Sequence, residues 1–216
     1  YSAISWFNIA HAYYSEREYE KAIEAFEFCI IINEDFASAY LDLAEVCMLL
    51  GMYQKATQNL KIAFERFEII EVEEIIQFAE SLIMSGEFRV AREPLQTGIL
   101  IDAADPDLLF LLAETYRLEG KNTLAILNYE LALEMDYRRD DIHKSLGKIY
   151  FLMAEFDKAQ SHFEAAILND PYHFGYRTEL ASFYLNIGEV EKCEKLLSES
   201  VEELPDIQLV YHHAAI

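Results

Sequence analysis

The sequence is poor in residues that interrupt helices. Its 216 residues include only seven glycines and four prolines, and no Ser-rich or Pro-rich tract separates one part from another. Linkers between independent domains usually have such a composition, so we expect a single domain over residues 1–216. Hydrophobic residues make up 53% of the chain, which is ample for a large core.

Positive charge and long apolar runs are also lacking. Lys and Arg number 17 against 39 Asp and Glu, which gives a formal net charge of −22. Nucleic acids and anionic membranes are bound mainly through Lys and Arg, so neither is an expected partner. No apolar run approaches the roughly 18 residues that cross a bilayer, so we predict no membrane insertion.

Cysteines and catalytic motifs are few. Cys29, Cys47 and Cys193 are widely spaced without a CxxC pair, which argues against disulfides or a thiolate metal site. No GxSxG, Walker, GxGxxG or HExxH motif occurs. We therefore expect no catalytic residues, no metal and no cofactor, with a reducing, cytoplasmic location. The chain starts at Tyr1 without Met and stops within an apolar segment, so we expect a piece of a longer protein.

The sequence does contain a regular repeat. A small residue preceded by an apolar one recurs at spacings of 34, 35, 34, 34, 34 and 34. These small residues are Ala10, Ala44, Ala79, Ala113, Gly147, Ala181 and Ala215. A second small residue follows twelve positions on, at Ala22, Ala56, Ala91, Ala125, Ala159 and Cys193. Small residues at fixed steps in a helical pattern indicate that another helix comes close at those points.

This pattern resembles a known family. Residues 6–29, WFNIAHAYYSEREYEKAIEAFEFC, resemble the tetratricopeptide repeat, and residues 146–171, LGKIYFLMAEFDKAQSHFEAAILNDP, resemble it more closely. The resemblance implies an all-α fold, a right-handed superhelical α-α solenoid of about six helix-turn-helix repeats. The predicted repeats are 3–36, 37–71, 72–105, 106–139, 140–173 and 174–207, and residues 208–216 would open a seventh or form a capping helix.

Two departures from the pattern carry structural expectations. Repeat three has an extra residue near Glu71 and Pro94 in its second helix, so we expect a local bend, or even a hinge, unless Pro94 lies in the first helical turn. His143 and Arg177 occupy a position that is apolar in the first four repeats, which favours looser packing near the C-terminal repeats.

The resemblance also implies where a partner would bind. Proteins of this family hold an extended peptide or a helix on the concave face, which is lined by the first helix, A, of each repeat. We therefore expect a non-catalytic interaction module or scaffold whose partner is a protein or peptide. The predicted strip consists of His11, Asp42, Glu45, Met48, Glu80, Ile83, Met84, Phe110, Glu114, Arg117 and Lys148. Carboxylates that alternate with Met and Phe favour a basic-hydrophobic segment, and the alternative is that this acidity serves only solubility.

The sequence also contains alternatives to this site and function. Some relatives clamp a carboxylate with Lys, Arg and Asn, but the corresponding places here, Phe7, His11, Asp42, Glu73 and Gln77, would repel it. Lys144 and Lys148, one turn apart, form an anion site or ordinary surface charge. The chain could also present substrates within a larger enzyme, or self-associate through its apolar end helices.

Overall fold

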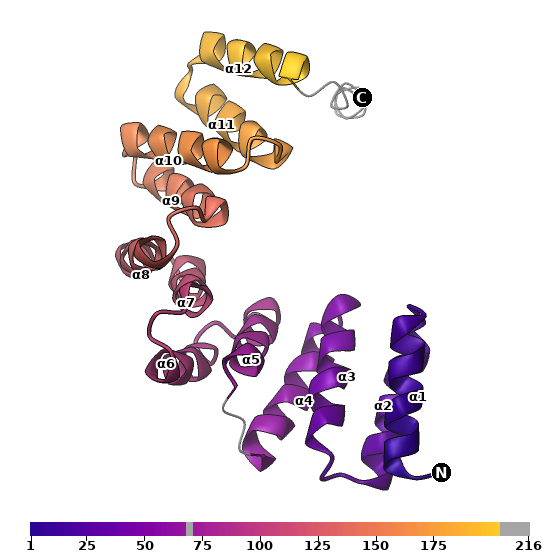
Figure 1. Cartoon of the computed structure of the whole chain (residues 1–216). Helices are drawn as coiled ribbons and strands as arrows, with labels where there is room; N and C mark the ends of the chain where they lie inside the picture. Colours follow the sequence, from indigo (N-terminus) through magenta and orange to yellow (C-terminus); the bar gives the residue numbers. More distant parts are fainter. Residues whose placement is uncertain (68–70, 204–216) are drawn as a thin grey trace. The chain divides into compact units, whose positions relative to one another are not determined.

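The computed structural model describes residues 1–67 and 71–203, with side chains up to residue 200 (Figure 1). These residues form twelve α-helices and no strand, which confirms the predicted all-α repeat solenoid. The helices are α1 (Ala3–Ser15), α2 (Tyr19–Ile32), α3 (Ala37–Leu49), α4 (Tyr53–Arg66), α5 (Val72–Met84), α6 (Arg92–Ile101), α7 (Pro106–Leu118), α8 (Asn122–Met135), α9 (Asp140–Leu152), α10 (Phe156–Asn169), α11 (Phe174–Ile187) and α12 (Val190–Glu203). The expected start of a seventh repeat, residues 208–216, lies outside the described part of the chain.

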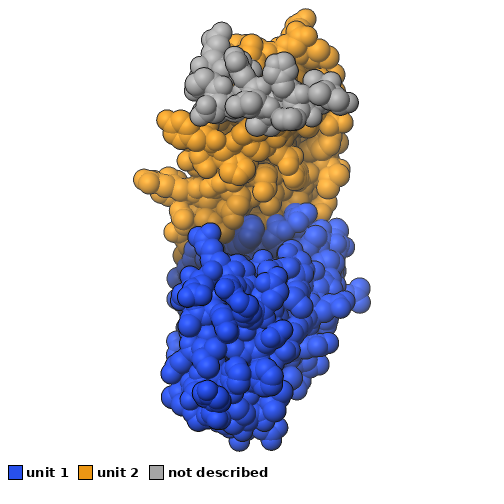
Figure 2. Space-filling model, turned by 90° about the vertical axis from the view of Figure 1, so that its right-hand side faces the viewer, with its two compact units in different colours: residues 1–121 blue, residues 122–216 orange. Residues whose placement is uncertain are grey.

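The helices group into two compact units. Unit 1 is Tyr1–Lys121 with α1 to α7, and unit 2 is Asn122–Ile216 with α8 to α12 (Figure 2). Within each unit every helix packs against the next one along the chain. A single solenoid domain over residues 1–216, with the six repeat boundaries given above, stays a prediction. None of the helices in the described ranges is both long and apolar enough to span a membrane.

The small repeat residues lie where the helices meet. Ala10, Ala44, Ala79 and Ala113 on the A helices are completely buried. So are the second-position residues of the first five repeats: Ala22, Ala56, Ala91, Ala125 and Ala159. Large side chains fill the remaining core, among them Phe26, Leu60, Leu95 and Tyr129, each at most 1% exposed. The alternation of small and large residues therefore reflects close helix packing around a shared core.

Every A helix is followed by a residue in the left-handed backbone region. Four of these residues are Gly51, Gly86, Gly120 and Gly188, and the other two are Arg17 at φ 59° and Ala154 at φ 58°. Side chains with a Cβ adopt this conformation at a cost of roughly 1–2 kcal/mol. The tight turn between the two helices is thus kept even where glycine is absent.

Repeat three departs from the others at the start of its second helix. Its second helix, α6, begins at Arg92 and has 10 residues, whereas the second helix, B, of each other repeat has 14. Pro94 is the third residue of α6, in the first turn, where its missing N–H costs no helical hydrogen bond. Pro94 therefore shortens the helix instead of kinking it, and a bend or hinge in this repeat stays a prediction.

The polar residues at core positions of repeats five and six are accommodated. Arg177 is buried at 7% exposure and donates to the Ser200 hydroxyl at 3.4 Å and to the Pro171 carbonyl at 3.3 Å. His143 is half-buried beside His162. Both positions are thus filled by polar contacts within unit 2, and the expectation of looser packing there stays a prediction.

We expect Gly147→Ala to lower the free energy of unfolding by about 1–3 kcal/mol. A Cβ on Gly147 would lie 2.8 Å from the ring of Phe163, which is only 3% exposed and has little room to move. Urea unfolding followed by circular dichroism measures this change, with Ser161→Ala on the exposed side of α10 as the control. Equal loss in the two variants would contradict the packing role of Gly147.

Candidate functional site

The predicted strip lies mostly on A helices of unit 1. Asp42, Glu45 and Met48 succeed one another at three-residue steps on α3 and therefore share one side of that helix. The helices α5 and α7 carry the next part of the strip. Two hollows of unit 1 are lined by eight of the eleven predicted residues: Asp42, Glu45, Met48, Glu80, Ile83, Met84, Phe110 and Glu114.

The first hollow is acidic and has a volume of about 520 Å³. It lies between α3 and α5 and is lined by Ser38, Leu41, Asp42, Glu45, Glu73, Glu74, Ile76, Gln77 and Glu80. Five of these nine residues carry carboxylates, and none carries a positive charge. We refer to it as the acidic hollow.

The second hollow is largely apolar and has a volume of about 400 Å³. Its lining residues are Met48, Tyr53, Glu80, Ile83, Met84, Phe110, Leu111 and Glu114. We refer to it as the apolar hollow. Glu80 lines both hollows, so a site for a cation and a site for an apolar side chain lie next to each other.

Several strip carboxylates already have partners within unit 1. Nε2 of His11 lies 3.0 Å from Oδ2 of Asp42. The Tyr14 hydroxyl donates to Oε1 of Glu45 at 2.7 Å, and this hydrogen bond raises the pKa of Tyr14 to about 12. Arg117 donates to Glu114 at 2.6 Å. Asp42, Glu45 and Glu114 therefore already have polar partners within unit 1, and the partner of Glu114 is a cation.

The other three acidic residues that line the acidic hollow have no such ion-pair partners in the part of the chain that the structure describes. Among the described residues, Glu73, Glu74 and Glu80 take part in no ion pair, and Oε2 of Glu74 is buried without a hydrogen-bond donor. Partial burial raises the pKa of Glu80, and the charges of Asp107 and Glu73 add to the rise. Burial likewise raises the pKa of Asp42, and His11 opposes that rise. Because crowded carboxylates repel one another and gain from a nearby cation, this hollow suits a Lys or Arg side chain.

Comparison with known proteins identifies the repeat. A sequence model of the tetratricopeptide repeat matches residues 3–36, and a second model of the same repeat matches residues 106–138 and 145–173. The TPR repeat-containing protein YpiA of Bacillus subtilis is 31% identical over 194 residues, which cover 85% of this chain and 44% of YpiA. The chain belongs to the tetratricopeptide repeat family. It spans less than two thirds of the length of the curated relatives that it matches.

Solved structures of other tetratricopeptide repeat proteins share the fold. The crystal structure of YrrB, described as a TPR protein with an unusual peptide-binding site, matches with a TM-score of 0.67 at 21% identity, over 81% of this chain and 90% of YrrB. A tetratricopeptide repeat protein from Parabacteroides merdae matches with a TM-score of 0.79 at 12% identity, over 93% of this chain and 79% of that one. These likenesses support the solenoid fold of this chain.

Lys148, which belongs to the predicted strip, lies in unit 2 and lines neither of the two hollows. Its ammonium group is 2.5 Å from Oε1 of Glu179, and the ammonium group of Lys144 lies over the Tyr176 ring at 5.8 Å. Since Glu179 balances the charge of Lys148, the structure gives no support to an anion site at these two lysines.

Two histidines of the tetratricopeptide repeat protein meet although their sequence spacing gave no such signal. Nδ1 of His143 on α9 lies 3.0 Å from Nδ1 of His162 on α10, and His162 stacks on the Tyr150 ring. Burial lowers the pKa of both, in His162 to about 4, where the neighbouring His143 and Lys158 also contribute. No group of three or more His, Cys, Asp or Glu residues in the described part of the chain has a metal-binding arrangement.

The cysteines of the tetratricopeptide repeat protein are core residues. All three are buried and free. Burial raises the pKa of the Cys29 thiol, and it raises that of Cys47 to about 11. A thiol with such a pKa is almost entirely protonated near neutral pH and is a poor nucleophile.

Sequence reasoning missed some residues that line the hollows. Tyr53 belongs to a B helix, α4, and was missed because only A helices were considered. Glu73 was noted only as a position unsuited to clamping a carboxylate, although it stands one turn before Gln77 on the same side of α5. Glu74 had no comparable signal, because most equivalent positions in the other repeats are buried: Ala39, Leu108, Ile142 and Tyr176.

We expect neutral His162 to stabilise the fold by about 2 kcal/mol more near pH 7 than near pH 5. The unfolded chain takes up a proton at this group near its ordinary pKa of 6.5, whereas the folded protein resists protonation until about 4. The contribution of neutral His162 to the free energy of unfolding is therefore complete above pH 6.5 and is lost as the pH falls from 6.5 toward about 4.

Urea unfolding of the parent and of His162→Asn at both pH values isolates this contribution. Asn stands at the same repeat position in α4 and α8, as Asn59 and Asn128, so the helix tolerates it. The carboxylates titrate alike in both proteins. An unchanged pH dependence in the variant would show that the folded-state pKa of His162 is not depressed.

Proposed function

We propose that the protein is a non-catalytic interaction module that binds an extended segment of a partner protein along the strip of unit 1. A Lys or Arg of that segment enters the acidic hollow, and an adjacent apolar side chain enters the apolar hollow. The observation that carries this proposal is the position of Glu80, which lines both hollows and so makes one binding element of the two. The description of YrrB as a peptide-binding TPR protein supports this class of ligand.

The energetics favour recognition by charge and shape together. Hydrogen bonds to charged groups contribute roughly 1.5–3 kcal/mol each where both partners are partly desolvated. The methionines and Phe110 adapt to different apolar side chains, so the apolar hollow accepts a class of residues instead of a single type. A short segment that uses both hollows should bind with a Kd on the order of micromolar, about −8 kcal/mol.

Selection from a library of displayed random peptides tests this function directly. We expect enrichment of Lys or Arg next to Leu, Met or Phe, since only such sequences occupy both hollows. Synthetic versions of the enriched peptides then serve as ligands in fluorescence anisotropy titrations. Recovery of peptides without basic residues would contradict the proposal.

Site variants connect the selected peptides to the acidic hollow. Glu73→Gln/Glu80→Gln removes two carboxylates that have no ion-pair partner in the described structure and should weaken binding about tenfold. Glu20→Gln/Glu24→Gln, on the exposed side of α2, changes the net charge equally and is the matched control. If the control weakens binding as much as the site variant, the acidity acts only through overall charge, and the specific site is wrong.

A further inference from the structure

The outer side of α8 differs from that of the other B helices. The repeat position of Leu124 is occupied by lysine in four of the other five repeats, as Lys21, Lys55, Lys158 and Lys192. The repeat position of Leu127 is polar or charged in all five others, as Glu24, Gln58, Glu93, Ser161 and Lys195. The fold thus has no need of leucine at either position.

The apolar residues of this helix form a continuous exposed stripe. Leu124, Leu127, Leu131 and Met135 are 42%, 53%, 37% and 49% exposed, and they follow one another at steps of three or four residues. We call these four residues the α8 stripe. It extends over roughly 17 Å at 1.5 Å per residue. Another side of α8 packs in the core through three completely buried residues, Ala125, Tyr129 and Ala132.

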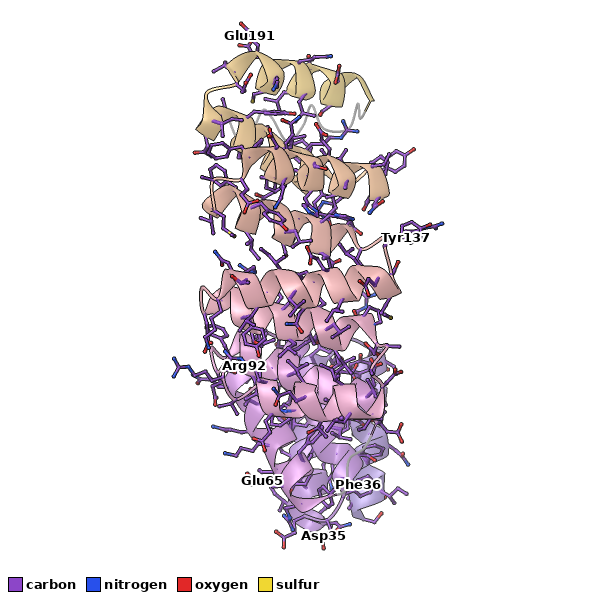
Figure 3. All side chains as sticks on the ribbon, turned by 90° about the vertical axis from the view of Figure 1, so that its left-hand side faces the viewer. Asp35, Phe36, Glu65, Arg92, Tyr137 and Glu191 are labelled. Carbon is purple, nitrogen blue, oxygen red and sulfur yellow. The ribbon has the colours of Figure 1, made fainter. Side chains whose placement is uncertain are left out.

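The charged residues of α8 itself are acidic. Within α8 the only charged residues are Glu130 and Glu134, both exposed. The cations near α8 are already engaged: Lys121 is paired with Glu119 at 2.9 Å, and Arg138 contacts the ring and hydroxyl of Tyr137. Lys158 on α10 is paired with Glu155 and is also close enough to Glu130 to attract it. Figure 3 shows Tyr137 projecting away from the ribbon just after α8. A partner on this stripe therefore meets leucine and methionine bordered by carboxylates.

We propose that the α8 stripe binds an amphipathic α-helix of a partner protein, with an apolar seam bordered by Lys or Arg. Steps of three and four residues match the seam that two packed helices share. Cations on the partner complement Glu130 and Glu134 and the net charge of −22. A second copy of this chain is the poorer occupant, because self-pairing would bring the same carboxylates together and join two strongly negative chains. This surface is independent of the strip in unit 1.

The test uses two synthetic helical peptides with leucine at every third or fourth position. One has lysine on both sides of the leucine seam, and the other has glutamate in the same places. Fluorescence anisotropy should give a Kd on the order of micromolar for the lysine peptide and a Kd at least about tenfold higher for the glutamate peptide. Equal binding of both peptides would overturn the charge argument.

The decisive variant is Leu124→Lys/Leu127→Glu. It introduces the residues that repeat one has at these positions, Lys21 and Glu24, and leaves the net charge unchanged. It should weaken binding of the lysine peptide at least about tenfold. The matched control is Leu152→Lys/Leu168→Glu, which replaces two other exposed leucines of unit 2 and should bind like the parent. Binding by the α8 variant equal to that of the parent would overturn the proposal.

Two further measurements exclude the other occupants. The strip in unit 1 also accepts Lys next to Leu, so the same titrations are repeated in a Glu73→Gln/Glu80→Gln background. There the lysine peptide should still bind with a Kd on the order of micromolar, and adding Leu124→Lys/Leu127→Glu should weaken it at least about tenfold. Loss of binding in Glu73→Gln/Glu80→Gln alone would place the peptide in the acidic hollow and overturn the proposal. Sedimentation velocity should show the same monomeric species for the parent and for Leu124→Lys/Leu127→Glu. A parent dimer that this variant dissociates would mean that a second copy covers α8.

Discussion

Close approach of helices at small residues is the constraint on which the whole structure depends. An antiparallel helix pair cannot bury its apolar face alone, so each pair must pack against its neighbours. That packing requires Ala, Gly or Cys wherever two helices come nearest, and large side chains such as Phe26 and Tyr129 between those points. Gly147 against the Phe163 ring and Gly98 against Leu108 are tight forms of this rule, since a Cβ at either glycine would lie 2.8 Å from the neighbouring side chain.

The same constraint decides which positions are left for recognition. Core packing uses Ala44 and Ala79 and the residues one turn from them on the inner side of each A helix. The positions two before, one after and four after each of these alanines point elsewhere, and there the sequence has Asp42, Glu45 and Met48 on α3. The carboxylates of the acidic hollow therefore stand at positions that the core does not use, whereas Ile83, Phe110 and Leu111 of the apolar hollow also pack in the core of unit 1.

Most of the fold and much of the candidate site could be predicted from the sequence, because both follow from a repeat of fixed length. The two turns without glycine could not be predicted from the sequence. Arg17 and Ala154 adopt positive φ there because the packing of the two adjoining helices requires it. The late start of α6 depends on whether Pro94 falls in the first turn, which the periodicity does not decide. The meeting of His143 and His162 depends on how α9 and α10 are rotated against each other.

Equivalent positions in the six repeats of one chain show which residue types the fold requires and which it merely tolerates. Each repeat places the same positions in nearly the same surroundings, so a residue type found in most repeats is known to be compatible with the fold. Lysine at the Leu124 position satisfies the fold in four repeats and also supports solubility. Replacing it with exposed leucine exposes apolar surface to water, a change with no evident benefit to a monomer. Because the fold does not require leucine at these positions, a partner helix that covers this side of α8 is a physical reason for their presence that the structure leaves open to test.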